Sequence, residues 1–146
     1  MKQVDRVMAI DFGAKRLGVA VSDLTGVLAQ PVTVIARSRI KEDLVLLAKV
    51  IEEYAIKRIV VGNPRTLAGA EGSQSARVHE FIKVLKRTFN LPVDLYDERL
   101  SSKQAMDRLA DTGIRGRDAK ASVDKVAAAL VLQAYLDRRR AGRAFR

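Results

Sequence analysis

The fold of this 146-residue chain is indicated first by the stretch VMAIDFGAKRLGVAVS, residues 7–22. Its first five residues, Val7–Asp11, form an apolar run that ends on an aspartate, and residues 17–22 form a second strand-like run. The segment DFGAKR between them has the glycine and polar residues that are typical of a tight turn. We therefore expect a hairpin, which VTVIAR (residues 32–37), introduced by Gln30-Pro31, extends to an antiparallel meander.

Helical and strand patterns alternate in the rest of the chain. Apolar residues recur at helical spacing in two segments, one with Leu44, Leu47, Ala48 and Ile51 and the other with Val78, Phe81, Ile82, Leu85 and Phe89. Short apolar strands are expected at 58–62 and 93–98, a helix from Ser101 to about Gly113, and a final helix over about 121–140.

The order β-β-β-α-β-α-β-α-α predicts an α/β fold. Three antiparallel strands followed by right-handed crossovers give a mixed five-stranded sheet of order 3-2-1-4-5, with helices on both faces. This is the ribonuclease H-like layout. No linker or repeat interrupts it, so we interpret residues 1–146 as a single domain.

Three acidic residues, Asp11, Glu98 and Asp124, stand where apolar elements begin or end. An unpaired buried charge there would cost several kcal/mol, so such carboxylates usually have a partner. The carboxyl ends of the parallel strands meet at one end of the sheet, and Asp124 shares a helix face with Ala128 and Val131, which can lie against that sheet. Three converging carboxylates suit Mg²⁺ or Mn²⁺ and in-line phosphodiester hydrolysis. We therefore predict that these three acids are both the metal ligands and the catalytic residues.

We do not assign Asp97 and His79 to the predicted metal site. Side chains alternate along a strand, so only one of Asp97 and Glu98 can face Asp11, and we select Glu98. The only histidine, His79, falls off the apolar stripe of its helix and is expected to be solvated.

The charge of the chain predicts a polyanionic partner. Lys and Arg number 27 against 17 acids, a net charge of +10, and residues 115–146 hold nine basic residues against three acids. Such a surface is typical of nucleic-acid binding, although a basic surface without a nucleic-acid partner is the alternative. We expect substrate contacts from Lys15, Arg16, Asn63, Arg65, Arg99, Arg115, Arg117 and Lys120.

The composition excludes several other classes of protein and of chemical site. There are no cysteines, so disulfides, zinc–thiolate sites and thiol nucleophiles are absent. No apolar run approaches the length of a membrane span, and the basic C-terminal segment lacks an apolar face for insertion. The N-terminal segment turns directly into a strand pattern and does not resemble a signal peptide, so a cytoplasmic location is expected.

Several segments, in this order, resemble the YqgF/RuvX family of small bacterial ribonuclease H-like proteins. They are AIDFGAKRLGVAVSD (9–23), VVGNP (60–64), GAEGS (69–73), YDERLSS (96–102) and SVDKVAAALVLQAYL (122–136). The resemblance implies an acidic triad at Asp11, Glu98 and Asp124. It also implies a nuclease that processes the 5′ end of precursor 16S rRNA in the small-subunit precursor or resolves Holliday junctions.

Three alternatives to the rRNA nuclease remain open at this point. A Holliday-junction enzyme would share the chemistry but should act as a two-fold dimer, whereas we expect a monomer or weak homodimer. A non-catalytic RNA-binding assembly factor could use the same acids for Mg²⁺-bridged binding. An actin-like ATPase ranks last, because the chain lacks a second subdomain to enclose a nucleotide.

Overall fold

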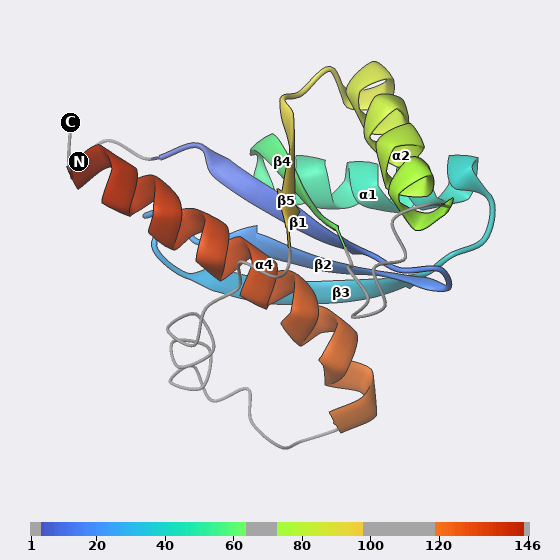
Figure 1. Cartoon of the computed structure of the whole chain (residues 1–146), viewed down its shortest axis with the longest axis horizontal. Helices are drawn as coiled ribbons and strands as arrows, with labels where there is room; N and C mark the ends of the chain where they lie inside the picture. The colour runs from blue at the N-terminus through green and yellow to red at the C-terminus, as the bar shows by residue number, and fades with distance from the viewer. Residues whose placement is uncertain (1–3, 64–72, 98–118, 145–146) are drawn as a thin grey trace.

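The computed structural model describes residues 4–63, 73–97 and 119–144, and within them the side chains of 4–62, 76–96 and 126–142 (Figure 1). The described elements are, in chain order, β1 (Arg6–Phe12), β2 (Arg16–Ser22), β3 (Ala29–Ala36), α1 (Ile40–Tyr54), β4 (Ile56–Asn63), α2 (Ser73–Phe89), β5 (Val93–Asp97) and α4 (Ala119–Ala144). The helix that we expect to begin at Ser101 lies outside the described residues.

The five strands form one sheet in the order β3-β2-β1-β4-β5, which confirms the predicted topology. β1 and β2, and β2 and β3, pair antiparallel, whereas β1 and β4, and β4 and β5, pair parallel. The three parallel strands therefore end at one end of the sheet, which is called the carboxyl end below.

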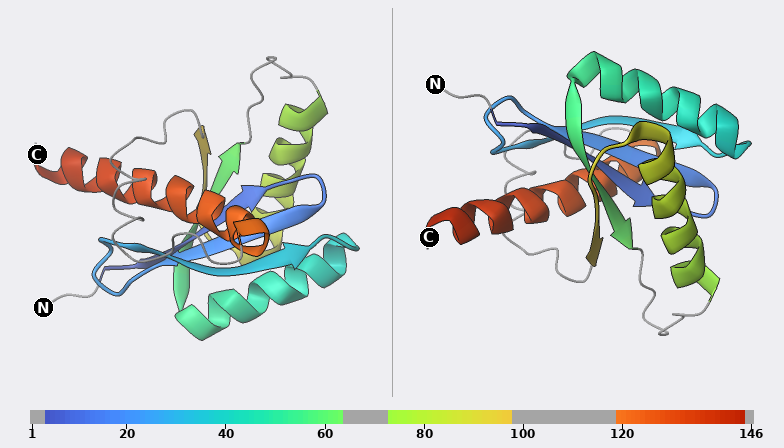
Figure 2. Two further views of the ribbon diagram at one scale, coloured as in Figure 1. Left: turned by 90° about the horizontal axis from the view of Figure 1, so that it is seen from below. Right: turned by 90° about the horizontal axis from the view of Figure 1, so that it is seen from above.

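Helices cover both faces of this sheet. α1 and α2 lie on one face and α4 crosses the other, and the C-terminal end of α4 lies on the side of the molecule where the chain begins (Figures 1 and 2). β1 has a core on each side. Met8 and Ile10 are buried with residues of α1 and α2, while Val7 and Ala9 are buried with residues of α4.

The third strand begins earlier than the sequence pattern indicates. It spans Ala29–Ala36, so Pro31 lies inside the strand instead of before it. The register with β2 pairs Ala20 with Pro31 and Val19 with Thr33, and it passes over Val32 as a bulge. Proline is tolerated in a strand at an edge or a bulge, where its missing N–H removes no ladder hydrogen bond. β3 is an edge strand, so the expectation that Gln30-Pro31 precedes the strand is wrong.

Gln133 joins α4 to the far edge of the sheet. Its buried side chain accepts a hydrogen bond from the Ala29 backbone N–H at 2.9 Å and donates to the Val27 carbonyl oxygen at 2.8 Å. The same amide nitrogen donates to Asp137 Oδ1 at 3.1 Å, one turn later in α4. Because Ala29 starts β3, this amide sets where α4 lies along the sheet.

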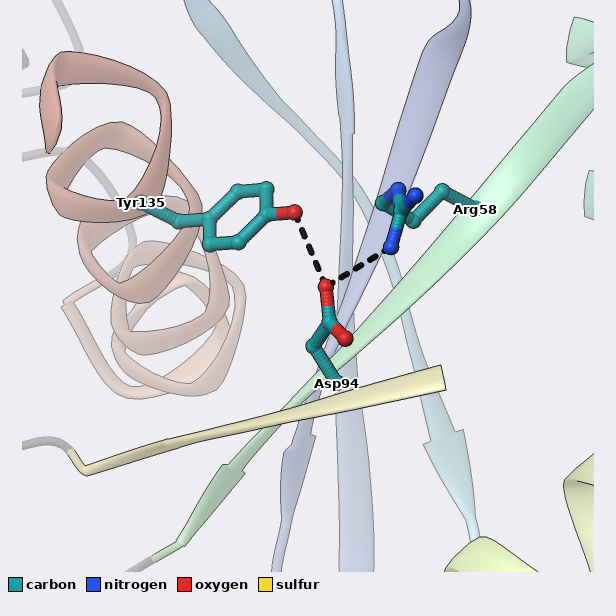
Figure 3. A network of polar contacts seen from close by, with 3 residues as sticks. All are labelled: Arg58, Asp94 and Tyr135. Carbon is teal, nitrogen blue, oxygen red and sulfur yellow. Dashed lines mark hydrogen bonds and ion pairs between the residues drawn. The ribbon is translucent and has the colours of Figure 1, made fainter. Parts of the chain in front are cut away.

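A second polar contact joins α4 to β4 and β5 (Figure 3). Asp94 Oδ2 accepts a hydrogen bond from the Tyr135 hydroxyl at 3.0 Å and pairs with Arg58 Nη1 at 2.9 Å. The ring of Tyr135 also packs edge-on against Tyr96, with ring centroids 6.1 Å apart. Burial, and then the hydrogen bond to Asp94, raise the pKa of the Tyr135 hydroxyl above its ordinary value.

Replacing Gln133 by leucine should destabilise the fold. The substitution keeps the bulk of the side chain but leaves the Ala29 N–H and the Val27 carbonyl oxygen without this partner, at a cost of about 2–4 kcal/mol. Urea unfolding followed by circular dichroism measures the loss, and Arg138→Leu, at an exposed position of the same helix, is the control. Equal stability of the parent protein and Gln133→Leu would show that the amide does not anchor α4.

The Tyr135→Phe variant should lower stability at neutral pH by about 1 kcal/mol, because one hydrogen bond to Asp94 is lost. The folded-state pKa of Tyr135 is raised, so its contribution is fully present below the unfolded value near 10.0 and is lost as pH rises through the higher folded value. The gap in unfolding free energy between the two proteins should therefore narrow as the pH rises above about 10. A gap that stayed constant over this range would contradict the coupling to Asp94.

Candidate functional site

Asp11 lies near the end of β1, at the carboxyl end of the sheet. Its register partners are Gly18 on β2 and Gly62 on β4, so neither neighbouring strand places a Cβ beside it. The carboxylate is half-buried, and no described residue donates a hydrogen bond to it or pairs with it. Asp11 is thus a carboxylate with a glycine as its register partner on each neighbouring strand and no protein partner among the described residues.

The pleat of β1 assigns Asp11 to the α4 face of the sheet. Val7 and Ala9 are buried with α4, and successive side chains along a strand point to opposite faces, so Asp11 follows them to that face. On the neighbouring strands, Gly62 pairs with Tyr96, whose ring is also buried with α4. Asp11, Gly62 and Tyr96 thus form a row across three parallel strands on one face.

The side-chain alternation of β5 indicates which of Asp97 and Glu98 faces the same side of the sheet as Asp11. Asp94 and Tyr96 both contact α4 residues, so the even-numbered positions of this strand face α4. Asp97 is the last residue of β5, its side chain is not among those described, and Glu98 lies outside the described residues. The preference for Glu98 over Asp97 therefore remains a prediction, and the alternation of β5 favours it.

Asp124 belongs to the first half of α4, although its side chain is not among those described. Ala128 and Val131, which follow it by four and seven residues, are buried against the sheet. Gln133 lies at the opposite end of the sheet. Along α4, Gln133 and Asp124 are about 14 Å apart, which is close to the roughly 13 Å that β1 spans from Val7 to Asp11. Figure 2 shows that α4 crosses the sheet on one face, so we expect Asp124, near the N-terminal end of this helix, toward the carboxyl end of the sheet, and its place in the site stays a prediction.

Lys15 and Arg16 belong to the turn and the start of β2 that follow Asp11, and both are exposed. The turn depends on Gly13, because a Cβ at this position would lie 2.6 Å from the Arg16 carbonyl oxygen. The Gly13 N–H donates to that oxygen at 3.0 Å. The glycine thus allows a tight connection in which two cationic residues follow Asp11 closely in the chain.

Arg37 contacts the turn that follows Asp11, and the sequence pattern did not identify it. Its guanidinium donates to the Gly13 carbonyl oxygen at 3.0 Å, and the guanidinium carbon lies 4.7 Å from the centroid of the Phe12 ring. Its backbone N–H donates to the Lys15 carbonyl oxygen at 2.9 Å. The signal was present in the predicted meander, which brings the end of the third strand beside the first turn.

The other predicted substrate contacts are placed only in part. Asn63 is the last residue of β4, at the carboxyl end, and Lys120 lies in the first turn of α4, but neither side chain is described. Arg65, Arg99, Arg115 and Arg117 lie outside the described residues. His79 is exposed on α2, as expected.

Within the described part of the chain, no group of three or more His, Cys, Asp or Glu side chains could hold a metal ion. Of the predicted acids, only Asp11 has a described side chain, so the predicted triad is not tested by this result. No described helix is both long and apolar enough to cross a membrane.

Comparison with known proteins identifies relatives along most of the chain. The family model RuvX, described as Holliday junction resolvase, matches residues 5–138. A protein of Desulforamulus reducens named "Putative pre-16S rRNA nuclease" is 42% identical over 132 residues, which cover 90% of this chain and 96% of the relative. A protein of the same name from Thermoanaerobacter pseudethanolicus is 41% identical over 133 residues, with the same coverage of both chains.

Solved structures with the same fold are more distant in sequence. RuvC of Thermus thermophilus, solved in complex with a Holliday junction substrate, superposes with a TM-score of 0.62 at 17% identity and covers 94% of this chain and 96% of its own. The fowlpox virus resolvase, in complex with Holliday junction DNA, gives a TM-score of 0.56 at 15% identity, with 91% and 97% covered. These similarities confirm the predicted ribonuclease H-like fold.

The relatives carry the names of nucleases, in agreement with the expectation of a hydrolase that acts on ester bonds. The family match spans both the strand that carries Asp11 and the helix that carries Asp124. The chain therefore belongs to the RuvX family, as the resemblance of its sequence segments predicted.

Proposed function

We propose that this protein is a metal-dependent endonuclease that hydrolyses phosphodiester bonds during 5′-end maturation of precursor 16S rRNA. The observation that carries the proposal is the setting of Asp11. This carboxylate lies at the carboxyl end of the parallel strands, where ligands of open α/β sheets bind, with a glycine on each neighbouring strand. The names of the relatives supply the rRNA substrate.

The metal would be Mg²⁺ or Mn²⁺, held by Asp11, Glu98 and Asp124. Asp11 fits such an ion because it offers hard carboxylate oxygens and no described residue occupies them. The direction of α4 and the alternation of β5 support the participation of Asp124 and Glu98. When bound, the metal would activate water and stabilise the leaving oxygen.

The chain itself would bind and orient the polyanion. Lys15 and Arg16 follow Asp11 closely in the chain and are exposed, so we assign them contacts with phosphates on either side of the bond that is cut. We assign a similar role to the remaining cationic and polar residues predicted from the sequence, which are Asn63, Arg65, Arg99, Arg115, Arg117 and Lys120. Contacts of this kind position the backbone of the substrate without reading its sequence.

A second candidate function is the resolution of branched DNA, which the description of the family model favours. It would use the same acids on a different substrate and would require two symmetric active sites. Work on precursor rRNA instead implies a cytoplasmic protein that meets the small-subunit precursor and can act as a monomer or weak homodimer.

The Asp11→Asn variant should cut at least about 100-fold more slowly than the parent protein, because it loses a charged metal ligand. Precursor 16S rRNA and a four-way DNA junction are each incubated with the parent protein and the variant in Mg²⁺ or Mn²⁺. Gel analysis of the 5′ ends gives the rate and the preferred substrate. Binding, measured by filter retention, should be retained.

Asp5→Asn is the matched control. Asp5 is an exposed aspartate just before β1, at the end of the strand away from Asp11, so this variant should cut at the parent rate. Cleavage of the junction alone would select the resolvase function. No cleavage of either substrate by the parent protein, with binding of RNA intact, would select a non-catalytic RNA-binding factor.

Removal of divalent metal should stop cleavage completely and reversibly. Dialysis against a chelator should leave the far-ultraviolet circular dichroism unchanged, since the two described cores are formed by apolar side chains. Adding back Mg²⁺ or Mn²⁺ should restore the rate. Titration calorimetry with Mn²⁺ should show binding to the parent protein and weaker binding to Asp11→Asn, and cleavage that persists in chelator would refute the metal mechanism.

A further inference from the structure

A pocket of about 330 Å³ opens beside the carboxyl end of the sheet, between β1, the start of α1 and α2. It lies on the α1 and α2 face, opposite the face assigned to Asp11. Its volume is near the lower limit of small-molecule sites, which run from roughly 300 to 1,000 Å³. The space suits one planar group with its attached sugar and does not suit a duplex.

The walls of this pocket are apolar and aromatic. Phe12 and Phe81 meet at one side with ring centroids 4.9 Å apart, and Ile40 and Ala76 contribute aliphatic surface. Both rings are buried, so a ligand would not stack directly on Phe12. It would contact Arg37, whose side chain lines the pocket and whose guanidinium lies over the Phe12 ring. Guanidinium planes and aromatic rings are the surfaces on which unpaired bases stack.

The rim of the pocket carries a net positive charge. Arg37 and Arg77 both line it, and Arg77 is exposed, without a described partner. The one acid on the rim, Glu80, is exposed and lies 3.6 Å from Lys83, in a solvated pair that contributes little. An apolar pocket with two arginines among its lining residues complements a nucleotide, whose base is apolar on its faces and whose phosphate is anionic.

The pocket is also close to the cleavage site proposed above. Phe12 directly follows Asp11 in β1, and the two side chains point to opposite faces of the sheet. A single strand that passes around the carboxyl end could therefore present a phosphate to Asp11 and a nearby base to the pocket. A base that is paired in a helix could not make this turn.

We propose that the pocket formed by Phe12, Arg37, Ile40, Ala76, Arg77 and Phe81 binds one unpaired nucleobase of the nucleic-acid substrate, next to the phosphate that is cut. The inference rests on the proposed nuclease function and deepens it. The pocket selects substrates with an unpaired nucleotide near the cleavage point, and Arg37 stacks on the base while it holds the Gly13 turn.

The test uses a short RNA duplex with one bulged 2-aminopurine, whose fluorescence changes on stacking, and the same duplex fully paired. Binding is measured in Mg²⁺ in the Asp11→Asn background, so that the probe is not cut. The variant Ala76→Phe fills the pocket from an exposed helix position, and Thr88→Phe places the same ring on an exposed position elsewhere on α2.

The protein should bind the bulged duplex about tenfold more tightly than the paired one, with a change in 2-aminopurine fluorescence. Ala76→Phe should lose both the preference and the fluorescence change, whereas Thr88→Phe should keep them. An abasic unit in place of the bulged base should weaken binding by the same factor of about ten. Ala76→Phe should bind this abasic duplex no more weakly, because the abasic unit and the substitution remove the same contact.

Equal binding of bulged and paired duplexes, or an unchanged preference in Ala76→Phe, would overturn the pocket assignment. This failure is distinct from failure of the proposed nuclease. If the parent protein cuts RNA and depends on Asp11, but Ala76→Phe cuts bulged and paired substrates with the parent's preference, only the pocket inference is lost. If Asp11→Asn cuts as fast as the parent, the proposed role of Asp11 in cleavage fails, and the fluorescence measured in chelator instead of Mg²⁺ then reports on the pocket alone.

Discussion

The pleat of β1 is the constraint on which the rest of the structure depends. This strand is the centre of the sheet, and each of its five buried side chains belongs to one of two cores. A shift of register by one residue would exchange the two sets and would bury the wrong side chains on both faces. The same alternation that packs Met8 and Ile10 under α1 and α2 delivers Asp11 to the opposite face.

The position of α4 is set by polar contacts on top of an apolar interface. Small and branched residues, including Ala128 and Val131, let the helix lie close to the sheet but would tolerate sliding along it. Gln133 and Tyr135 remove that freedom, since each makes hydrogen bonds to groups at fixed places on β3 or β5. A helix with its second half fixed in this way also has a fixed first half, which is where Asp124 lies.

Much of this architecture could be predicted from the sequence because its signals are local. Apolar runs of strand length and the glycine in the first turn gave the strand order, and helical periodicity gave the buried faces of α1 and α2. The start of β3 could not be predicted, because a proline inside a strand is acceptable only once the strand is known to be at an edge. Arg37 escaped notice for a related reason, since its contacts to Gly13 and Phe12 join residues that are distant in the chain. The acids could be proposed from the sequence because carboxylates are conspicuous in apolar surroundings, whereas a pocket has no sequence pattern of its own.

The proline and the bulge in β3 also affect how the molecule behaves in a crowded solution. An edge strand normally offers a row of unpaired N–H and C=O groups to any other extended chain, and this is a common route to aggregation. In β3, Pro31 has no N–H to offer and the bulge at Val32 interrupts the spacing of the remaining groups. The opposite edge, β5, is only five residues long. A basic protein that works among long polyanions thus carries a sheet whose described edges are poor templates for the addition of another strand.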